Sequence, residues 1–193
     1  MLKKKLENYI ANNLIDNKIE LPEVVTEYVR KHNLVSEEVT VVDSAIQFDV
    51  IELCNKETEE LIRTEEVNFL NESISYLDKN REEFIYLESK SFELARIDAI
   101  VLELDDVFET YTALFGLKLQ KKFGADFKAF LDLNLTGDGV KYSVIFSDAD
   151  GLWDVNLALN YVDGFNEDLT FIKVADLIYR FVYNLVEAVE DAQ

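Results

Sequence analysis

Apolar and polar residues alternate in three consecutive stretches near the C-terminal end of the chain: 127–135, 140–147 and 152–162. A period of two is typical of a β-strand that is buried on one face. Asp138-Gly139 and Asp150-Gly151 stand between the stretches, where tight turns favour residues that tolerate positive φ. Strands joined so closely must be antiparallel. The pattern therefore predicts an antiparallel meander over 127–162, with Trp153 on its buried face.

The next stretch, 171–190, has apolar residues at helical spacing and predicts one long helix. A helix that packs on the apolar face of the meander is a stable two-layer arrangement. Three further residues flank its apolar stripe, namely Tyr179, Tyr183 and Val186. This flank is expected either to be buried by the helix that apolar spacing predicts from Ile97 onward or to contact a partner.

The N-terminal part has both helical and extended patterns. Leucine or isoleucine recurs every four residues over 2–15 and predicts an amphipathic helix, and Pro22 can open a second helix. Residues 38–53 are rich in valine and isoleucine and predict two short strands that break near Asp43-Ser44. We expect these strands to pair with the meander and to enlarge its sheet.

The middle of the chain has a less decisive pattern. Apolar spacing over 64–78 favours a helix, whereas 82–88 is compatible with either a strand or a helix. Between Ile97 and Phe115, apolar residues recur at alternating spacings of four and three, which predicts a helix that continues to Phe123. The whole chain, 1–193, is expected to form one α+β domain. Its antiparallel sheet would contain the meander 127–162 and one or two strands from 38–53, covered by helices on one face.

The chain is strongly acidic, with 39 acidic and 19 basic residues and a net charge of -20. This charge favours either general solubility or attraction to a basic partner. Nucleic-acid binding is disfavoured because it needs a concentrated basic surface. No stretch approaches the ~20 apolar residues of a membrane span. Because there is one cysteine, no intramolecular disulfide can form, and we expect a cytoplasmic protein.

Sequence motifs for catalysis or cofactor binding are absent, including the phosphate-binding and nucleotide-binding glycine patterns and the serine nucleophile motif. His32 is the only histidine and Cys54 the only cysteine, so a usual four-ligand zinc site of these residues is excluded. Cys54 ends an apolar run and is expected to be an inert buried thiol, and His32 an exposed turn residue. We expect no cofactor and no metal.

The densest group of carboxylates lies on the helix predicted around Ile97–Phe115, and its members are Glu103, Asp105, Asp106 and Glu109. At helical spacing, Glu103 would share a face with Asp106, and Asp105 with Glu109. Such a group could bind a divalent cation or act as a general acid and base. The polar face of a half-buried helix explains the same residues.

These observations favour a non-catalytic protein that binds another protein, as an inhibitor, immunity-type protein or adaptor does. The flank formed by Tyr179, Tyr183 and Val186 is the candidate interaction surface, and the partner would be another protein or a second copy of the chain. Two alternatives stay open at this stage. One is an enzyme that uses the carboxylate group, with or without a divalent cation, and the other is a self-associating structural protein.

Overall fold

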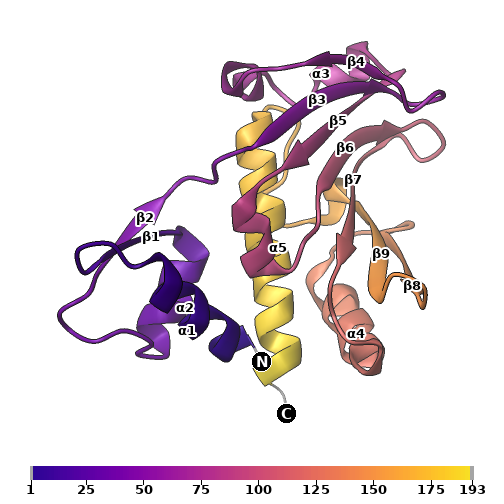
Figure 1. Cartoon of the computed structure of the whole chain (residues 1–193). Helices are drawn as coiled ribbons and strands as arrows, with labels where there is room; N and C mark the ends of the chain where they lie inside the picture. Colours follow the sequence, from indigo (N-terminus) through magenta and orange to yellow (C-terminus); the bar gives the residue numbers. More distant parts are fainter. Residues whose placement is uncertain (1, 192–193) are drawn as a thin grey trace.

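A curved antiparallel sheet wrapped around one long helix forms the centre of the molecule (Figure 1). The computed structural model describes residues 2–191. The sheet has seven strands in the order β4-β3-β5-β6-β7-β9-β8. Its strands are β3 (Val50–Asn55), β4 (Leu61–Thr64), β5 (Glu83–Glu88), β6 (Ile100–Asp105), β7 (Thr110–Leu117), β8 (Tyr142–Ser147) and β9 (Leu152–Ala158). The expected α+β class, with an antiparallel sheet and helices on one face, is confirmed.

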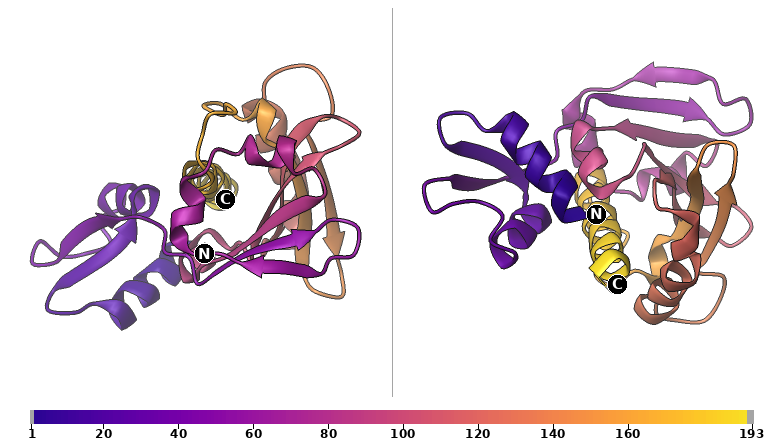
Figure 2. Two further views of the ribbon diagram at one scale, coloured as in Figure 1. Left: turned by 90° about the horizontal axis from the view of Figure 1, so that it is seen from above. Right: turned by 60° about the horizontal axis from the view of Figure 1, so that its bottom comes forward.

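The helix in the hollow of the sheet is α5 (Phe171–Asp191), in agreement with the predicted 171–190. Viewed along α5, the sheet curls around one side of the helix and the N-terminal segment lies on the other (Figure 2). Because α5 is covered on both sides, it needs apolar residues on more than half of its circumference. This explains why Tyr179, Tyr183 and Val186 are apolar or aromatic although they lie beside the main stripe.

The N-terminal segment forms a small βαβ unit against the open side of α5. It contains α1 (Leu2–Asn13), β1 (Lys18–Pro22), α2 (Glu23–Lys31) and β2 (Thr40–Ser44). β1 and β2 pair in parallel, so of the two strands expected in 38–53 only β3 joins the large sheet. β3 pairs with β5 and β4 and not with the meander. Arg180 of α5 holds α2 through Glu23 (2.6 Å) and Glu27 (3.3 Å).

The first predicted strand of the meander, 127–135, is a helix in the structure, α4 (Gly124–Asn134). Phe127 and Leu131 are buried four residues apart, whereas Leu133 is 82% exposed. The apolar residues of this run fit both the strand period of two and the helical period of 3.6, and a run this short does not decide between them. α4 packs between the sheet and α5, where Phe127 contacts Trp153 and Phe130 contacts Phe181. The other two meander strands are confirmed as β8 and β9, followed by η4 (Leu159–Tyr161).

The helix predicted from Ile97 to Phe123 is wrong, because this segment contains β6 and β7, two inner strands of the sheet. Short 3₁₀ turns flank them, η2 (Lys90–Ala95) and η3 (Lys121–Phe123). The segment 64–78, expected to be helical, contains only η1 (Val67–Asn71) and α3 (Tyr76–Lys79). In both cases tertiary pairing overrides a local pattern of apolar spacing.

Trp153 confirms the predicted register of its strand. It is 6% exposed and packs edge-on against Phe127 and Phe146, with ring centroids 5.5 and 5.1 Å away. The alternating residues Val155 and Leu157 face the same core.

A buried ionic network joins the two ends of the described chain. Arg96 contacts the carboxylate of Glu190 near the end of α5, with Nη2 to Oε1 at 2.9 Å, and both side chains are at least nine-tenths buried. The backbone N–H of Leu2 donates to Oε2 of the same carboxylate at 2.6 Å. Removing one partner of such a pair leaves an uncompensated charge in the core.

Candidate functional site

The large sheet is covered on one face only, and its uncovered face is the candidate site. In a β-strand, neighbouring residues point to opposite faces. The inner face, toward α5, carries a row across five strands that is 0% exposed: Leu53, Ile85, Leu102, Ala113 and Leu157. The neighbouring residues of the same strands form the outer row: Glu52, Tyr86, Val101, Leu114 and Asn156. Those five residues range from half-buried to exposed.

Three hollows on this outer face meet at Leu114, and we call them together the outer-face groove. Their volumes are about 460, 380 and 100 Å³. The floor is apolar and includes Phe84, Tyr86, Val101 and Leu114. A concave surface with an apolar floor and polar groups at its margin is typical of a binding site.

Carboxylates dominate the margin of the groove. Six line the three hollows: Glu52, Glu59, Asp98, Glu103, Asp105 and Asp154. The basic lining residues are Lys56 and Lys141, and both are already engaged. Lys56 Nζ donates to the Leu104 carbonyl (2.7 Å) and to Asp106 (2.9 Å), and Lys141 Nζ donates to the Leu135 carbonyl (2.9 Å). The groove therefore presents an excess of negative charge over an apolar floor.

The ionisation of two outer-face groups reflects this partly dry, acidic setting. Burial raises the pKa of Glu103, and nearby Asp105 and Asp106 raise it further against the opposing effect of Lys56. Burial also raises the pKa of Tyr86 to about 12, with help from the hydrogen bond that its hydroxyl donates to Glu88 Oε1 (2.5 Å). Tyr86 is thus a neutral aromatic donor at physiological pH.

Asp98 is fixed at the end of the groove by the backbone. Its Oδ1 accepts the N–H of Gly116 (2.7 Å) and that of Ala99 (2.6 Å). A Cβ at position 116 would lie 2.3 Å from Asp98 Oδ2, so a larger residue there would displace the carboxylate from this position. This is the close approach that a glycine inside a strand often marks.

Of the acidic group predicted on a helix, Glu103 and Asp105 both line the outer-face groove, whereas Asp106 and Glu109 do not. The group lies on β6 and on the turn to β7, where each carboxylate has a different environment. Glu103 faces the groove, while Asp105 Oδ1 accepts the N–H groups of Val107 (2.8 Å) and Phe108 (2.9 Å) and shapes the turn. Asp106 pairs with Lys56, and Glu109 lies 3.7 Å from Arg81. Within residues 2–191, no three His, Cys, Asp or Glu side chains are arranged to hold a metal ion.

The candidate surface formed by Tyr179, Tyr183 and Val186 lies inside the protein. All three residues are 0% exposed. Tyr179 packs against Phe92 and its hydroxyl donates to the Ser91 carbonyl (3.0 Å), while Tyr183 contacts Tyr28 of α2. The flank is therefore covered by η2 and by the N-terminal unit, and it is not a surface that a partner can reach in this structure.

Cys54 and His32 lie on different elements. Cys54 is buried on β3, and burial, followed by the charge of Glu52, raises the pKa of its thiol. This agrees with the expectation of an inert thiol. His32 follows α2 and is half-buried rather than exposed, because it stacks on Tyr28 at 4.1 Å and lies 3.7 Å from Glu187.

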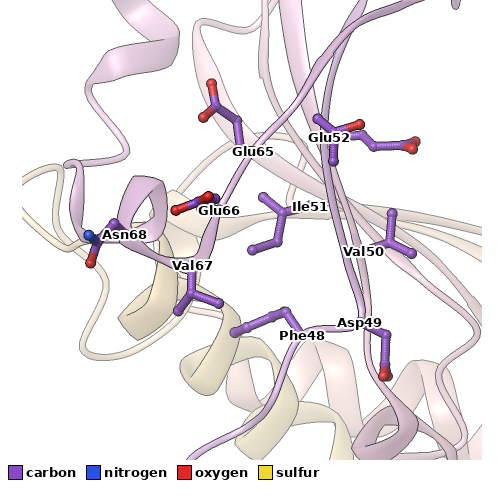
Figure 3. A pocket seen from close by; sticks show the side chains of 10 residues that line it. Phe48, Asp49, Val50, Ile51, Glu52, Glu65, Glu66, Val67 and Asn68 are labelled. Atoms are coloured by element: carbon purple, nitrogen blue, oxygen red, sulfur yellow. The ribbon is translucent and has the colours of Figure 1, made fainter.

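A further hollow of about 610 Å³ lies where β3 and the chain beyond β4 diverge, and we call it the edge cleft (Figure 3). Phe48, Val50, Ile51 and Val67 supply its apolar surface. Asp49, Glu52, Glu65 and Glu66 are its four carboxylates, and none of its ten lining residues is basic. Glu52 also lines the outer-face groove, so the two hollows are neighbours on the surface.

The sequence-based interpretation missed the outer row and the edge cleft. The relevant signal was present as the alternation Val50, Glu52, Cys54 beside Ile51 and Leu53. The same alternation in β6 and β7 did not reveal the outer face, because those strands were interpreted as a helix.

In the part of the chain that the structure describes, no helix combines the length and the apolar character needed to cross a membrane. Comparisons of the chain with protein-family models, with curated proteins and with solved structures find no match.

Proposed function

We propose that this is a non-catalytic cytoplasmic protein whose outer-face groove binds a basic protein partner. The observation that carries the proposal is the uncovered sheet face, with an apolar floor around Leu114 and six carboxylates against two engaged lysines at its margin. An inhibitor or adaptor that binds a cationic protein needs such an acidic surface with an apolar centre.

The floor and the margin of the groove would act in different steps of binding. Burial of the apolar floor contributes roughly 25 cal/mol per Å² of apolar surface removed from water and slows dissociation. The carboxylates attract a cationic partner over a distance and speed association. Tyr86 adds an aromatic residue of the kind enriched at binding hot spots.

A partner other than a second copy of the chain is favoured by charge. Each chain has a net charge of -20, and like charges brought together at an interface cost free energy. The positive charges of a basic protein would instead be attracted by the carboxylates of the groove.

The experiment uses two charge-reversal variants of the full chain. The margin variant is Glu59→Lys/Asp154→Lys, and the control variant is Glu7→Lys/Glu38→Lys, which makes the same change in net charge at exposed positions of the N-terminal unit. Immobilised wild type, margin and control proteins are incubated with extract of the source cells. We expect a basic protein to be retained by the wild type and by the control, and lost by the margin variant.

Kinetics with the purified partner then test the mechanism. Between about 0.1 and 1 M salt the screening length falls from about 10 to about 3 Å, so the association rate should fall steeply. The margin variant should lower the association rate by about tenfold. Val101→Ser, in the floor, should mainly raise the dissociation rate. A partner that binds both charge variants equally, without salt dependence, would contradict the proposal.

A further inference from the structure

The large sheet has edges at β4 and β8, and the β4 edge is short and carries exposed apolar side chains. All four β4 residues are exposed, including Leu61 (53%) and Ile62 (44%). Edge strands are commonly protected by an outward-pointing charge, because their unpaired backbone groups can pair with another chain. The only charged residue of β4 is Arg63, and its guanidinium is turned back onto Glu65 (2.5 Å) and the Tyr76 hydroxyl (3.1 Å).

The hydrogen-bond directions along β4 identify which groups face the free edge. The N–H of Glu65 donates to the Ile51 carbonyl (2.8 Å), and Arg63 stands opposite Leu53. Backbone groups in an antiparallel strand alternate between its two edges. The register of the two strands shifts between Leu53 and Cys54, so the alternation restarts there, and beyond the shift the N–H of Asn55 donates to the Glu60 carbonyl (2.9 Å). The backbone groups of Leu61 and Thr64 therefore point away from β3.

Acidic residues stand at both ends of this edge. Glu59 and Glu60 precede β4, and Glu65 and Glu66 follow it. At the second end the edge cleft opens, because the two segments diverge beyond the hydrogen bond from the Glu65 N–H to the Ile51 carbonyl (Figure 3). Among the side chains that the structure describes, none forms a hydrogen bond or ion pair with the carboxylate of Glu52 or Glu66. This arrangement repels a second copy of the chain and attracts a cationic segment.

We propose that an extended basic segment of the partner adds to the sheet as an eighth strand along β4, with a lysine or arginine entering the edge cleft. Its backbone would pair with the outward groups of Leu61 and Thr64, as in peptide recognition by strand addition. The aliphatic stem of the basic residue would pack on Val67 and Phe48 while its charge meets the carboxylates of the cleft. This inference rests on the proposed function and names how the partner is bound.

The test measures binding of short peptide probes to the full ¹⁵N-labelled chain from its amide chemical shifts. The first probe is seven residues of alternating threonine and valine with arginine at both ends. The second has glutamate in place of arginine, and the third has proline at its centre. We expect the arginine probe to shift amides of 61–68, and the other two to bind at least tenfold more weakly.

Two variants separate backbone pairing from charge. Thr64→Pro removes an outward N–H at an edge position that tolerates proline, and Thr64→Ala is its matched control. We expect binding to be lost in the first and retained in the second, with both unfolding near the wild-type temperature. Glu52→Gln/Glu66→Gln should weaken the arginine probe by roughly three- to tenfold.

The outcomes distinguish the two proposals. If the arginine probe binds no better than the glutamate probe, or shifts amides around Leu114 or none at all, strand addition at β4 is overturned. The same holds if Thr64→Pro binds as tightly as Thr64→Ala, or if the probe promotes pairing of two copies instead. A partner lost from the margin variant but unaffected by Thr64→Pro would leave the proposed function standing without this inference.

Discussion

The two faces of the seven-stranded sheet are built from alternate residues of the same strands, yet they differ in almost every physical respect. On β6, Leu102 is 0% exposed beneath α5, while the adjacent Val101 is half-buried at the groove. The inner face is closed by α4 and α5. The outer face has the same backbone hydrogen bonds but no helical cover within residues 2–191, and it gathers carboxylates around its apolar floor.

The comparison shows that adjacent residues of one strand have different roles: one residue packs in the core and stabilises the fold, and the next is available for binding. A substitution on the inner face removes packing that the fold needs, whereas one on the outer face changes a surface that the fold tolerates as partly wet. Four predictions test how complete this separation is.

The largest effect is expected from removing the cover of the inner face. A chain that ends at Thr170 lacks α5 and exposes the whole inner row, so we expect soluble, folded protein to be lost. Circular dichroism during thermal unfolding measures this. A truncated protein that still unfolds cooperatively would show that another element covers the sheet.

A matched pair on β6 gives the next largest effect. Leu102→Ala should lower the free energy of unfolding by about 2–5 kcal/mol because it leaves a cavity under α5. Val101→Ala, one residue away, should cost less than about 1 kcal/mol because its site is already half-open to solvent. Urea unfolding of both variants gives the difference. Equal losses would mean that the outer face is as tightly packed as the inner one.

Gly116→Ala is expected to break the rule that outer-face changes are mild. The new Cβ would displace the Asp98 carboxylate and remove its bonds to two backbone N–H groups, which should cost about 1–3 kcal/mol. In an Asp98→Ala background the same substitution should cost much less. A double-mutant cycle by urea unfolding measures this coupling, and additive effects would rule out the collision.

The smallest effect concerns Glu103. Because its pKa is raised in the folded protein, its ionisation opposes folding as pH rises through that pKa, and its neutral form is the better tolerated one. Glu103→Gln should therefore slightly stabilise the protein at pH 7, and the gain should vanish below the pKa of the carboxyl in the unfolded chain. Thermal unfolding across pH 3.5–7 checks this. A stabilisation that grows toward low pH would reverse the assigned sign.

Sequence patterns predicted the elements whose local and tertiary preferences agree. β8, β9 and α5 have strong periodicity, clear turn residues and a single buried face, and Trp153 lies where its register placed it. α1 ends within two residues of its predicted end, and α2 begins directly after Pro22 as expected.

The misassigned elements have patterns that fit two periods at once. The apolar positions of 97–115 fit a helical seam, but Ile100, Leu102 and Leu104 also alternate, and only pairing with β5 and β7 decides between them. The strand-ending turn depends on Asp105 accepting two N–H groups, a local interaction that apolar spacing does not register. The prediction of the acidic site followed the same error. A helix would have placed the four carboxylates close together, whereas the hairpin brings only Glu103 and Asp105 to the groove.

The position of α5 in the chain also has a consequence for biosynthesis. Every strand of the sheet precedes α5, and the network at Glu190 joins its far end to Leu2. Chains emerge from the ribosome at about 5–20 residues per second, so the strands wait for several seconds before the helix that covers them exists. During that interval the inner row is bare. The chain is therefore expected to depend on chaperones that shield apolar surface while it is being translated, more than a protein whose sheet is covered as it forms.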